Sequence, residues 1–446
     1  MGLGIVRWAL SASLFSPDRT AAAAGLEETL LVMHHWRTND GLSIGLSDRS
    51  VQDVVQRYGT PLYLYDLSKL RQQFLAISRV LGKDYAIHYS LKANNNLTIS
   101  AELARLGCRA DVSSEGELLI VSAAGFPPAG TIVTGPGKTP SLIKAALEHG
   151  AGLMTVESMT EARRVNLEAQ RLGRCQRVLL RVNPARKPAG HGLAIATGIT
   201  KFGVDEDQAP NVMEQVRSLR NIRCVGIQIF SESNILSADT LARHHVDTVA
   251  IAQRLRDRGF PIEIVDFGGG IGVPYRPAER PFDLERYAST THELAINHDF
   301  QFILELGRYL VAESGTYLTR VLDIKQSYGQ TIVIVDGGVN HLFRPRLLHA
   351  NALLEVIGKR EPPSQTVSIH GPLPSPEDCL VDRLALPPLD VGDLLAIRNC
   401  GAYGLSHGLL GFVSHPMPAE VVVDGDRHRL ARERGSPADA LMRQRP

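Results

Sequence analysis

Tyr85-Ala86-Ile87-His88-Tyr89-Ser90-Leu91-Lys92-Ala93-Asn94 is the stretch around which the rest of this chain is organised. It is an apolar, aromatic-rich run of strand length that ends at a single lysine. A lysine at the carboxyl end of a buried strand loses hydration, so we expect a lowered pKa and an amine that can condense with an aldehyde. The stretch alone does not decide this, because a strand-end lysine is more often a solvated boundary residue.

From Tyr85 onward, a short apolar strand, a polar turn and an amphipathic helix follow one another repeatedly. We expect strands at 85–90, 109–112, 131–134, 153–156, 178–182, 225–230, 263–267 and 302–305. The helices between them end at glycine, as is typical of helix C-termini, at Gly107, Gly125, Gly150, Gly173 and Gly259. Strands alternating with helices in this number predict an α/β protein with a closed (β/α)8 barrel, and an open doubly wound sheet is the structural alternative.

Segments on both sides of the barrel have a different pattern. Residues 41–45 and Pro61–Tyr65 predict strands, Val51–Tyr58 predicts a helix, and Asp66 predicts the cap of a further helix. After about residue 320, strands without long helices between them predict a smaller all-β, β-barrel-like domain, with strands at 321–328, 331–336, 365–369, 394–398 and 419–423. The predicted division is a flexible extension over 1–40, a strand and helix over 41–62 that partly join the β domain, the barrel over 63–320, the β domain over 321–428, and a charged tail over 429–446. We expect the charged segment from Arg427 to Pro446 to fray.

Composition excludes several classes of function. The net charge of +1 argues against nucleic acid or an anionic membrane as the main partner. The five cysteines form no C-x-x-C pair, which indicates a reducing compartment, here the cytoplasm, and no structural zinc site. No apolar run reaches the ~20 residues of a membrane span. The first 24 residues resemble a signal peptide only weakly, because serines and Asp18 interrupt the apolar part, and we expect an extension or a mis-assigned start instead.

Chemistry in a barrel of this kind gathers at the carboxyl ends of the strands. The predicted strands end in polar or glycine residues, namely Lys92, Asp111, Thr134-Gly135, Glu157, Arg181 with Asn183, Ser231 to Ser233, Gly268 to Gly270, and Glu305. Three consecutive glycines can turn backbone N–H groups toward a phosphate, although a tight turn alone explains them equally well. Glu305 is either an ion-pair partner of Arg308 or the group that keeps a pyridine nitrogen protonated. The hydroxyl of Tyr403 either packs in a turn or binds a phosphate oxygen.

In combination these motifs resemble the pyridoxal 5'-phosphate (PLP) decarboxylases of the alanine-racemase-like fold, which act on diaminopimelate, ornithine and arginine. The resemblance covers residues 41–425. Tyr89 to Asn94 is similar to the Schiff-base lysine motif of the family, Asp111 to Glu117 to the adjoining cofactor segment, and Lys201-Phe202-Gly203 to another signature. Gly268 to Gly270 resembles the phosphate loop, Glu305-Leu306-Gly307-Arg308 the E-P-G-R segment, and Gly401-Ala402-Tyr403 the phosphate-binding tyrosine.

The resemblance implies specific site residues and a head-to-tail homodimer with the active site across its interface. Lys92 and Glu305 are the implied catalytic residues. The implied cofactor-binding residues are Lys92, Asp111, Ser233, Gly268, Gly269, Gly270, Glu305, Gly307, Arg308 and Tyr403. Arg344, Asp378 and Tyr403 are the implied substrate-binding residues, and Arg344 is equally well read as an ordinary surface arginine.

Four positions depart from the family pattern. Leu306 replaces the proline of E-P-G-R, and Phe230 replaces a histidine that stacks on the cofactor ring. Glu232 replaces a small glycine. Pro374 stands where the family has a cysteine that returns a proton to the product carbon, and proline cannot donate one. The segment around Pro374 is more similar to that of family members with secondary-metabolism and carrier-protein substrates.

We therefore expect a PLP-dependent amino-acid α-decarboxylase with a specialised substrate. A free amino acid, a siderophore intermediate and a carrier-bound aminoacyl group all fit the sequence. Two alternatives remain at this point. One is a racemase of the same fold, against which Glu305 argues, and the other is a PLP-binding homologue without activity, for which Phe230, Glu232 and Pro374 argue.

Overall fold

A closed barrel of eight parallel strands forms the larger part of the molecule. The computed structural model describes residues 46–185, 193–194, 199–230, 232–348, 351 and 353–445. The barrel strands are β2 (Tyr85–Ser90), β3 (Arg109–Val112), β4 (Thr131–Val133), β5 (Leu153–Val156), β6 (Gln176–Asn183), β9 (Ile222–Gln228), β11 (Ile264–Asp266) and β12 (Gln301–Leu306). Each pairs in parallel with its neighbour, and the pairings of β2 with β12 and of β5 with β6 complete the ring. The predicted barrel is confirmed, and the open sheet is wrong.

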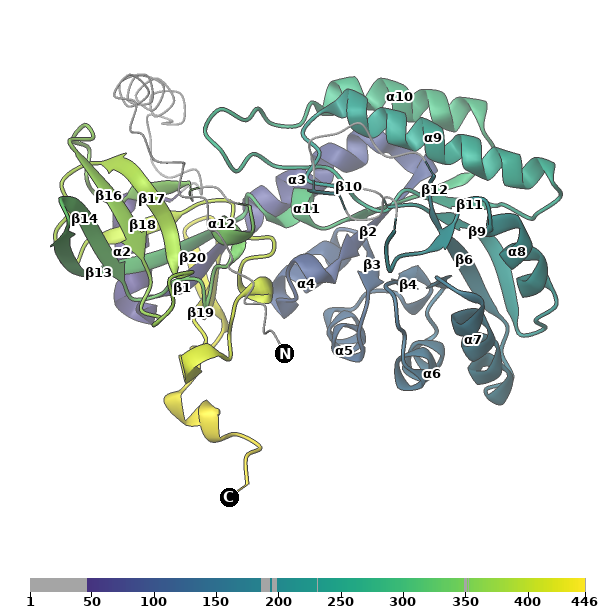
Figure 1. The fold of residues 1–446 in the computed structure, drawn as a ribbon, viewed down its shortest axis with the longest axis horizontal. Coiled ribbons are helices and arrows are strands. Elements are labelled where there is room, and N and C mark those ends of the chain that lie inside the picture. The colour runs from purple at the N-terminus through teal and green to yellow at the C-terminus, as the bar shows by residue number, and fades with distance from the viewer. Residues whose placement is uncertain are drawn as a thin grey trace, which may run out of the picture.

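Helices surround the barrel on its outside (Figure 1). They are α3 (Leu67–Leu81), α4 (Leu97–Arg105), α5 (Glu115–Ala124), α6 (Pro140–His149), α7 (Met159–Arg171), α8 (Ala209–Arg217), α9 (Ala238–Asp257), α10 (Leu284–Asn297) and the short α11 (Arg308–Val311). Asp66 caps α3 as predicted, because its carboxylate accepts from the backbone N–H groups of Ser68 and Lys69. Gly125 and Gly150 end α5 and α6 in the left-handed conformation, which glycine adopts without steric cost.

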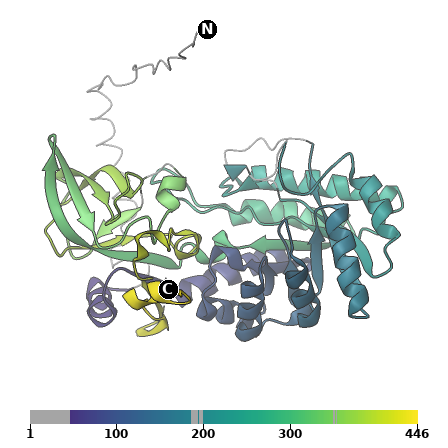
Figure 2. The same ribbon diagram turned by 60° about the horizontal axis from the view of Figure 1, so that its bottom comes forward.

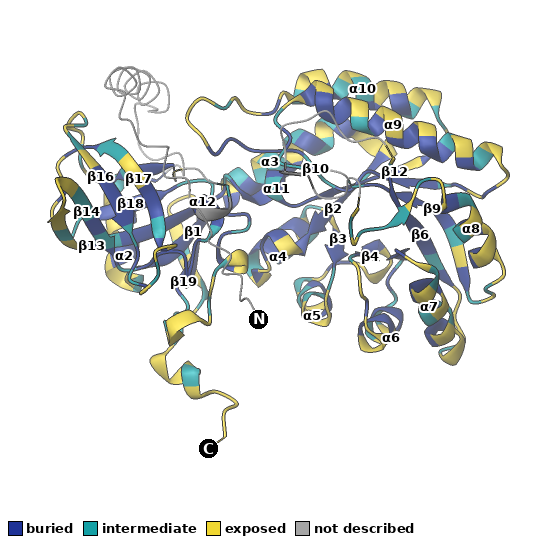
Figure 3. Ribbon diagram, viewed as in Figure 1, coloured by how far each residue is buried: buried dark blue, intermediate teal, exposed yellow. Residues whose placement is uncertain are grey.

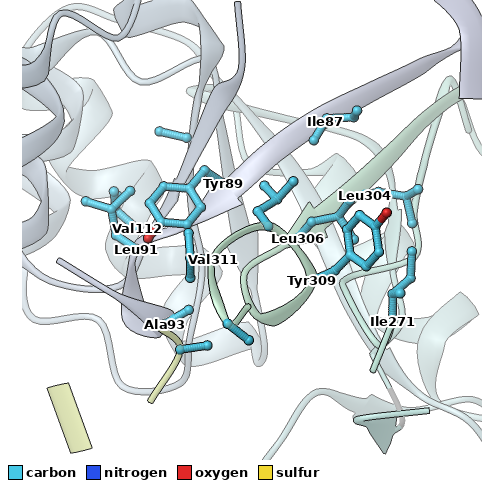
Figure 4. Packing of buried hydrophobic residues seen from close by; sticks show 14 of the residues in the cluster. Ile87, Tyr89, Leu91, Ala93, Val112, Ile271, Leu304, Leu306, Tyr309 and Val311 are labelled. Atoms are coloured by element: carbon cyan, nitrogen blue, oxygen red, sulfur yellow. The ribbon is translucent and has the colours of Figure 1, made fainter. Parts of the chain in front are cut away.

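Two layers of apolar side chains hold the barrel together. An inner layer closes the barrel floor with one side chain from each of six strands, Ile132, Leu153, Leu179, Val225, Ile264 and Ile303. An outer layer lies between strands and helices, so the helices are buried on one side and exposed on the other (Figure 3). Around the end of β2, Tyr89, Leu91 and Ala93 pack near Val311, while Leu306 and Tyr309 pack on the other side (Figure 4). This packing fixes the strand end that carries Lys92.

The second domain is a mostly antiparallel sheet at the other end of the molecule (Figure 2). Its strands are β1 (Leu62–Asp66), β13 (Gly315–Ser327), β14 (Gln330–Val335), β15 (Leu354–Val356), β16 (Gln365–His370), β17 (Cys379–Leu386), β18 (Leu394–Ile397), β19 (Ala419–Asp424) and β20 (Arg427–Arg432). Helix α2 (Asp48–Tyr58) packs Val51, Val54 and Val55 against one face of this sheet. The predicted helix over 51–58 is therefore confirmed, and the predicted strand over 41–45 lies outside the described residues.

The sheet differs from the sequence predictions at its edges. β1, which was predicted at the start of the barrel region, pairs with β13 and β19 of the second sheet. The tail does not fray from Arg427 onward, because β20 pairs with β19. Charged residues predominate in β20, which as an edge strand leaves them in water. We accordingly propose that the barrel spans residues 67–314 and that the β domain combines 46–66 with 315–432.

Neither a membrane-spanning segment nor a metal cluster is found in the described ranges. No helix there is long and apolar enough to cross a membrane. No three His, Cys, Asp or Glu side chains there gather as metal ligands would.

Candidate active site

Lys92 lies in the short turn Leu91–Ala93 that follows β2, and its side chain lines a cavity. Its Nζ donates to Asp111 Oδ2 at 2.7 Å and to Ser90 Oγ at 3.3 Å. Asp111 is fully buried and also accepts from Ser90 Oγ and from Thr134 Oγ1, both at 2.6 Å. Both carboxylate oxygens of Asp111 are hydrogen-bonded, which fixes the position of the amine.

The expectation of a lowered pKa for Lys92 is wrong for the protein without a ligand. Burial lowers the pKa of Lys92, but the carboxyl groups of Asp111 and Glu305 act in the opposite direction, so that the pKa is raised above its ordinary value. The sequence could not reveal this, because the position of Asp111 beside the amine depends on the parallel pairing of β2 with β3.

The turn after Lys92 is held from two sides. Tyr89 Oη donates to the carbonyl oxygen of Asn94 at 2.6 Å, and Asn94 Nδ2 donates to the carbonyl oxygen of Gly401 at 2.9 Å. The backbone N–H of Tyr403 donates to the carbonyl oxygen of Ala93 at 2.8 Å. The loop of the β domain that carries Tyr403 is thus hydrogen-bonded to the barrel next to Lys92.

Glu305 is buried near the end of β12, in the same cavity as Lys92. Its Oε1 accepts from Gln228 Nε2 at 2.7 Å. Burial raises the pKa of Glu305 well above its usual range, and the nearby carboxyl groups of Asp111 and Asp266 raise it further. A cation brought next to Glu305 would reverse this effect and stabilise the carboxylate.

Asp266 is a second buried carboxyl group, at the end of β11. Its Oδ1 accepts from the backbone N–H of Gly268 at 2.8 Å, and its carboxyl group lies within hydrogen-bonding reach of Glu305. Two carboxylates cannot form a hydrogen bond unless one of them carries a proton. Burial raises the pKa of Asp266 to about 7, which is consistent with one proton held by the pair.

The turn Gly268-Gly269-Gly270 lies directly against β12 and the cavity. Gly268 and Gly270 have φ of +63° and +117°, and the carbonyl oxygen of Gly268 accepts from Glu305 N at 2.7 Å. A Cβ on Gly269 would lie 2.6 Å from the carbonyl oxygen of Glu305, so no larger residue fits. The turn is therefore tight, and Gly269 and Gly270 also line a pocket with Ser233 and Arg308.

Arg308, the first residue of α11, lies beside this glycine turn. Its Nη1 donates to Tyr275 Oη at 2.7 Å, its Nη2 donates to Ser233 Oγ at 3.5 Å, and its Cζ lies 4.7 Å from the ring centroid of Tyr403. Its buried Nε has no hydrogen-bond partner among the described residues. A guanidinium with a free donor next to backbone N–H groups is suited to a phosphate. Gly307 packs closely on Ala93 and Ser90, where a Cβ would lie 2.8 Å from Ala93 Cβ.

Arg344 reaches the same cavity from the β domain. It is 3% exposed, and its guanidinium donates to the carbonyl oxygens of Asn399 and Arg398 and lies over the ring of Tyr275, 4.3 Å from the centroid. It is therefore not an ordinary surface arginine.

The cavity measures about 440 Å³, which is in the usual range for a small-molecule site. Its wall includes Lys92, Thr134, Arg181, Phe202, Gln228, Phe230, Ser233, Glu305, Arg308, Arg344, Leu348, Tyr403 and His407.

Some residues singled out in the sequence lie elsewhere. Asp378 does not line the cavity of this chain, because its carboxylate accepts from the backbone N–H groups of Val339 and Leu373, each at 2.7 Å. Pro374 is exposed. Glu232 is buried with its Oε2 3.9 Å from His244 Nε2, and it does not line the pocket formed by the glycine turn and Arg308. Glu157 pairs with Arg181 and accepts from the backbone N–H of Gly203, so it supports the cavity wall.

Comparison with known proteins places the chain in a family. Residues 67–319 match the profile of the pyridoxal-dependent decarboxylases, in the pyridoxal binding domain. This chain belongs to the pyridoxal-dependent decarboxylases. The cofactor of the family is PLP.

Individual relatives extend the likeness over nearly the whole chain. L-glutamyl-[BtrI acyl-carrier protein] decarboxylase of Niallia circulans is 32% identical over 416 residues, which cover 90% of this chain and 97% of that protein. Diaminopimelate decarboxylase of Helicobacter pylori (strain J99) is 34% identical over 389 residues, 86% of this chain and 95% of that protein. The crystal structure of the Helicobacter pylori enzyme complexed with L-lysine matches with a TM-score of 0.82 at 32% identity, covering 88% of this chain and 98% of that one.

The residues of this decarboxylase site fit PLP. The glycine turn and the free Arg308 Nε suit its phosphate, Glu305 suits its ring nitrogen, and Lys92 suits its aldehyde. Phe230, in place of the usual histidine, lies on the cavity wall against Gly268 and offers an apolar face for a ring.

Three residues at this site were not identified from the sequence. Gln228 donates a hydrogen bond to Glu305. Asp266 lies between Glu305 and the glycine turn, where it accepts from Gly268 N. Tyr275 contacts Arg308 and Arg344. The sequence did contain a hint of Gln228 and Asp266, because each is a polar residue near the end of an apolar strand. Nothing in the sequence indicated Tyr275.

Proposed function

We propose that this decarboxylase removes the α-carboxylate from an amino acid with a carboxyl function at the far end of its side chain. The main support is Arg344, a buried guanidinium on the cavity wall with no carboxylate partner among the described residues. The described hydrogen-bond partners of Arg344 are two backbone carbonyl oxygens and the Cys400 sulfur, so its charge still lacks an anionic partner. A distal carboxyl or acyl oxygen of the substrate would supply that partner.

The cofactor would be held from several elements. Lys92 would bind its aldehyde carbon covalently, and Gly268 to Gly270 with Ser233, Arg308 and Tyr403 would hold its phosphate. When bound, PLP supplies an electron sink for the pair left behind as CO2 departs. Asp111 keeps the Lys92 amine in place through the 2.7 Å hydrogen bond.

Glu305 would determine how strongly the cofactor ring withdraws electrons. Its carboxylate would stabilise a proton on the ring nitrogen, and Gln228 would keep Oε1 oriented through the 2.7 Å hydrogen bond. This role distinguishes the site from that of a racemase, in which the family resemblance implies an arginine at this place.

A proton must return to the product carbon, and Pro374 cannot supply it. Lys92 Nζ and Tyr403 Oη both reach the cavity wall and both carry protons. We favour Lys92, because Asp111 Oδ2 at 2.7 Å holds its Nζ in the cavity. Pro374 therefore does not require the loss of activity.

We further propose a specialised substrate, free or attached to a carrier protein, in agreement with the likeness to the Niallia circulans enzyme. The experiment is a panel for CO2 release with L-glutamate, meso-diaminopimelate, L-lysine, L-ornithine and a carrier-bound L-glutamyl thioester. We expect release from a substrate with a distal carboxyl or acyl group and little from L-lysine or L-ornithine. Equal release from all of them would contradict the role of Arg344, and racemisation or binding without CO2 would contradict decarboxylation.

The role of Lys92 has its own test. The protein with PLP should show an absorbance band near ~420 nm from the imine, and Lys92→Ala should abolish both the band and CO2 release. Lys201→Ala, which removes an exposed lysine near Phe202, is the matched control and should retain both. A band that survives in Lys92→Ala would exclude Lys92 as the residue that forms the imine.

A further inference from the structure

Tyr275 is a buried tyrosine that touches both guanidinium groups of the site. Its ring centroid lies 4.3 Å from Arg344 Cζ and 5.4 Å from Arg308 Cζ. Its hydroxyl oxygen accepts the 2.7 Å hydrogen bond from Arg308 Nη1. One side chain therefore presents its ring to one cation and its oxygen to the other.

The two arginines come from different domains and share this one neighbour. Arg308 begins α11 in the barrel, and Arg344 begins α12 (Arg344–Leu347) in the β domain. Asn399 strengthens the connection, because its carbonyl oxygen accepts from Arg344 and its Nδ2 donates to the carbonyl oxygen of Pro274 at 2.8 Å. The backbone of Tyr275 is held in turn by Glu279 Oε2, which accepts from Tyr275 N at 2.7 Å.

Two neighbouring cations with no carboxylate partner among the described residues repel each other in a site of low polarity. A carboxylate between them would remove the repulsion, but it would also neutralise the charges that anionic ligands need. The negative face of an aromatic ring and a hydroxyl oxygen stabilise cations without formal charge. Tyr275 thus reduces the repulsion and leaves both arginines able to bind anions.

We propose that Tyr275 is a positioning and specificity-determining residue that holds Arg308 and Arg344 as two adjacent, separate anion subsites. Arg308 serves the phosphate of the cofactor, and Arg344 serves the distal carboxyl function of the substrate. The inference rests on the proposed function for the second of these assignments, and it adds the residue that keeps the two subsites apart.

Two substitutions separate the two contacts. Tyr275→Phe keeps the ring next to Arg344 and removes the acceptor for Arg308, so we expect PLP affinity to fall about tenfold and KM to stay within about twofold. Tyr275→Leu removes both contacts, so we expect a comparable loss of PLP affinity together with a roughly tenfold rise in KM and a smaller change in kcat. PLP affinity is measured by titrating the cofactor-free protein, and KM and kcat by CO2 release at saturating PLP.

Tyr85→Phe is the matched control, because it removes a buried hydroxyl that donates to Thr291 O at 2.8 Å and touches neither arginine. It should leave PLP affinity and KM unchanged. Should Tyr275→Leu not accumulate as folded protein, Tyr275→Met takes its place. Unchanged PLP affinity and KM in both Tyr275 variants, or a loss of kcat alone, would overturn the inference.

A second probe keeps this test independent of catalysis. Glutarate, a five-carbon dicarboxylate, should bind the PLP-loaded protein at Arg344, and Tyr275→Leu should weaken its binding about tenfold. If the wild-type protein releases no CO2 from any substrate, the proposed function fails, while the glutarate and PLP titrations still decide the role of Tyr275. Glutarate binding that is absent, or equal in both proteins, would overturn it.

Discussion

At the scale of single residues, the most consequential contact is between the carboxyl groups of Asp266 and Glu305. Both are buried, and Asp266 also holds the glycine turn through Gly268 N. Asp266 raises the pKa of Glu305, so the charge on one carboxyl group affects the protonation of the other. The pair therefore connects the glycine turn to Glu305.

Asp266→Asn tests the shared proton. An aspartate with a folded-state pKa of about 7 binds more protons in the folded than in the unfolded chain, so stability falls as pH rises from about 4 toward 7. The slope contributed by one such group is on the order of 1 kcal/mol per pH unit. The asparagine variant should lose this part of the slope while its Oδ1 still accepts from Gly268 N. Urea unfolding of the PLP-free protein between pH 5 and pH 8 measures it, and identical slopes in both proteins would contradict the assignment.

Site residues could be predicted from the sequence where they belong to a motif, but not where only a contact in the folded protein identifies them. Lys92, Glu305, Arg308 and Tyr403 follow recognisable neighbours in the chain, and the structure brings them to one cavity. The partner of Gln228 lies 77 residues away and that of Tyr275 lies 33 residues away. Such pairs arise only when strands and loops are placed in space, so local pattern carries no signal for them.

At the scale of elements, the glycine turn after β11 is a tightly constrained piece of backbone in the site. It combines a positive φ at Gly268 and Gly270 with a close approach of Gly269 to β12. Both functions predicted for it, a tight turn and a phosphate cradle, follow from the same lack of side chains.

Gly269→Ala should damage this element. The new Cβ would lie 2.6 Å from the carbonyl oxygen of Glu305, so β12 or the turn must shift, at a cost of about 1–3 kcal/mol in stability and with weaker PLP binding. Thermal unfolding and PLP titration measure the two effects. Gly116→Ala in α5 is the control, because its Cβ meets nothing closer than 3.9 Å and alanine favours a helix by ~0.5–1 kcal/mol. Equal PLP affinity in the Gly269→Ala variant and the wild type would show that the turn is not part of the cofactor site.

Elements were predicted well in the barrel and less well in the β domain. Most barrel strands are short apolar runs before a polar residue and are followed by a helix with a side-chain cap, so pattern and structure agree, although α8 and α11 have no such cap. β20 was read as a fraying tail because its sequence, Arg427 to Arg432, is dominated by charge. β15 and β17 were missed, and β17 pairs with β16 through register shifts that break the expected alternation.

At the scale of the whole molecule, the site depends on contact between two domains. Barrel residues supply Lys92, Glu305 and Arg308, and β-domain residues supply Arg344 and Tyr403. The hydrogen bond of Tyr403 N to Ala93 O holds the two parts in register next to Lys92. Neither domain alone contains the complete set.

The head-to-tail homodimer stays a prediction, and solution mass tests it. We expect sedimentation equilibrium to give twice the 48.6 kDa of one chain. Leu409, Phe412 and Val413 leave large apolar surfaces exposed in the segment that begins near His407 on the cavity wall, as an interface would. Phe412→Glu should shift the mass toward that of one chain and lower the activity. A wild-type mass of 48.6 kDa at all concentrations would contradict the dimer.

The pairing of β1 with β13 has a consequence for how such a protein can change over time. The chain leaves the second sheet after Asp66 and re-enters it at Gly315, where Tyr65 pairs with Gly315 and Asp66 N donates to Ser314 O at 2.8 Å. The points at which the chain leaves and re-enters the sheet are neighbours, so the entire barrel is an insertion in one connection of the second sheet. In an evolutionary descendant of this protein, the inserted barrel could be lengthened, replaced or lost while every strand pairing of the second sheet is kept.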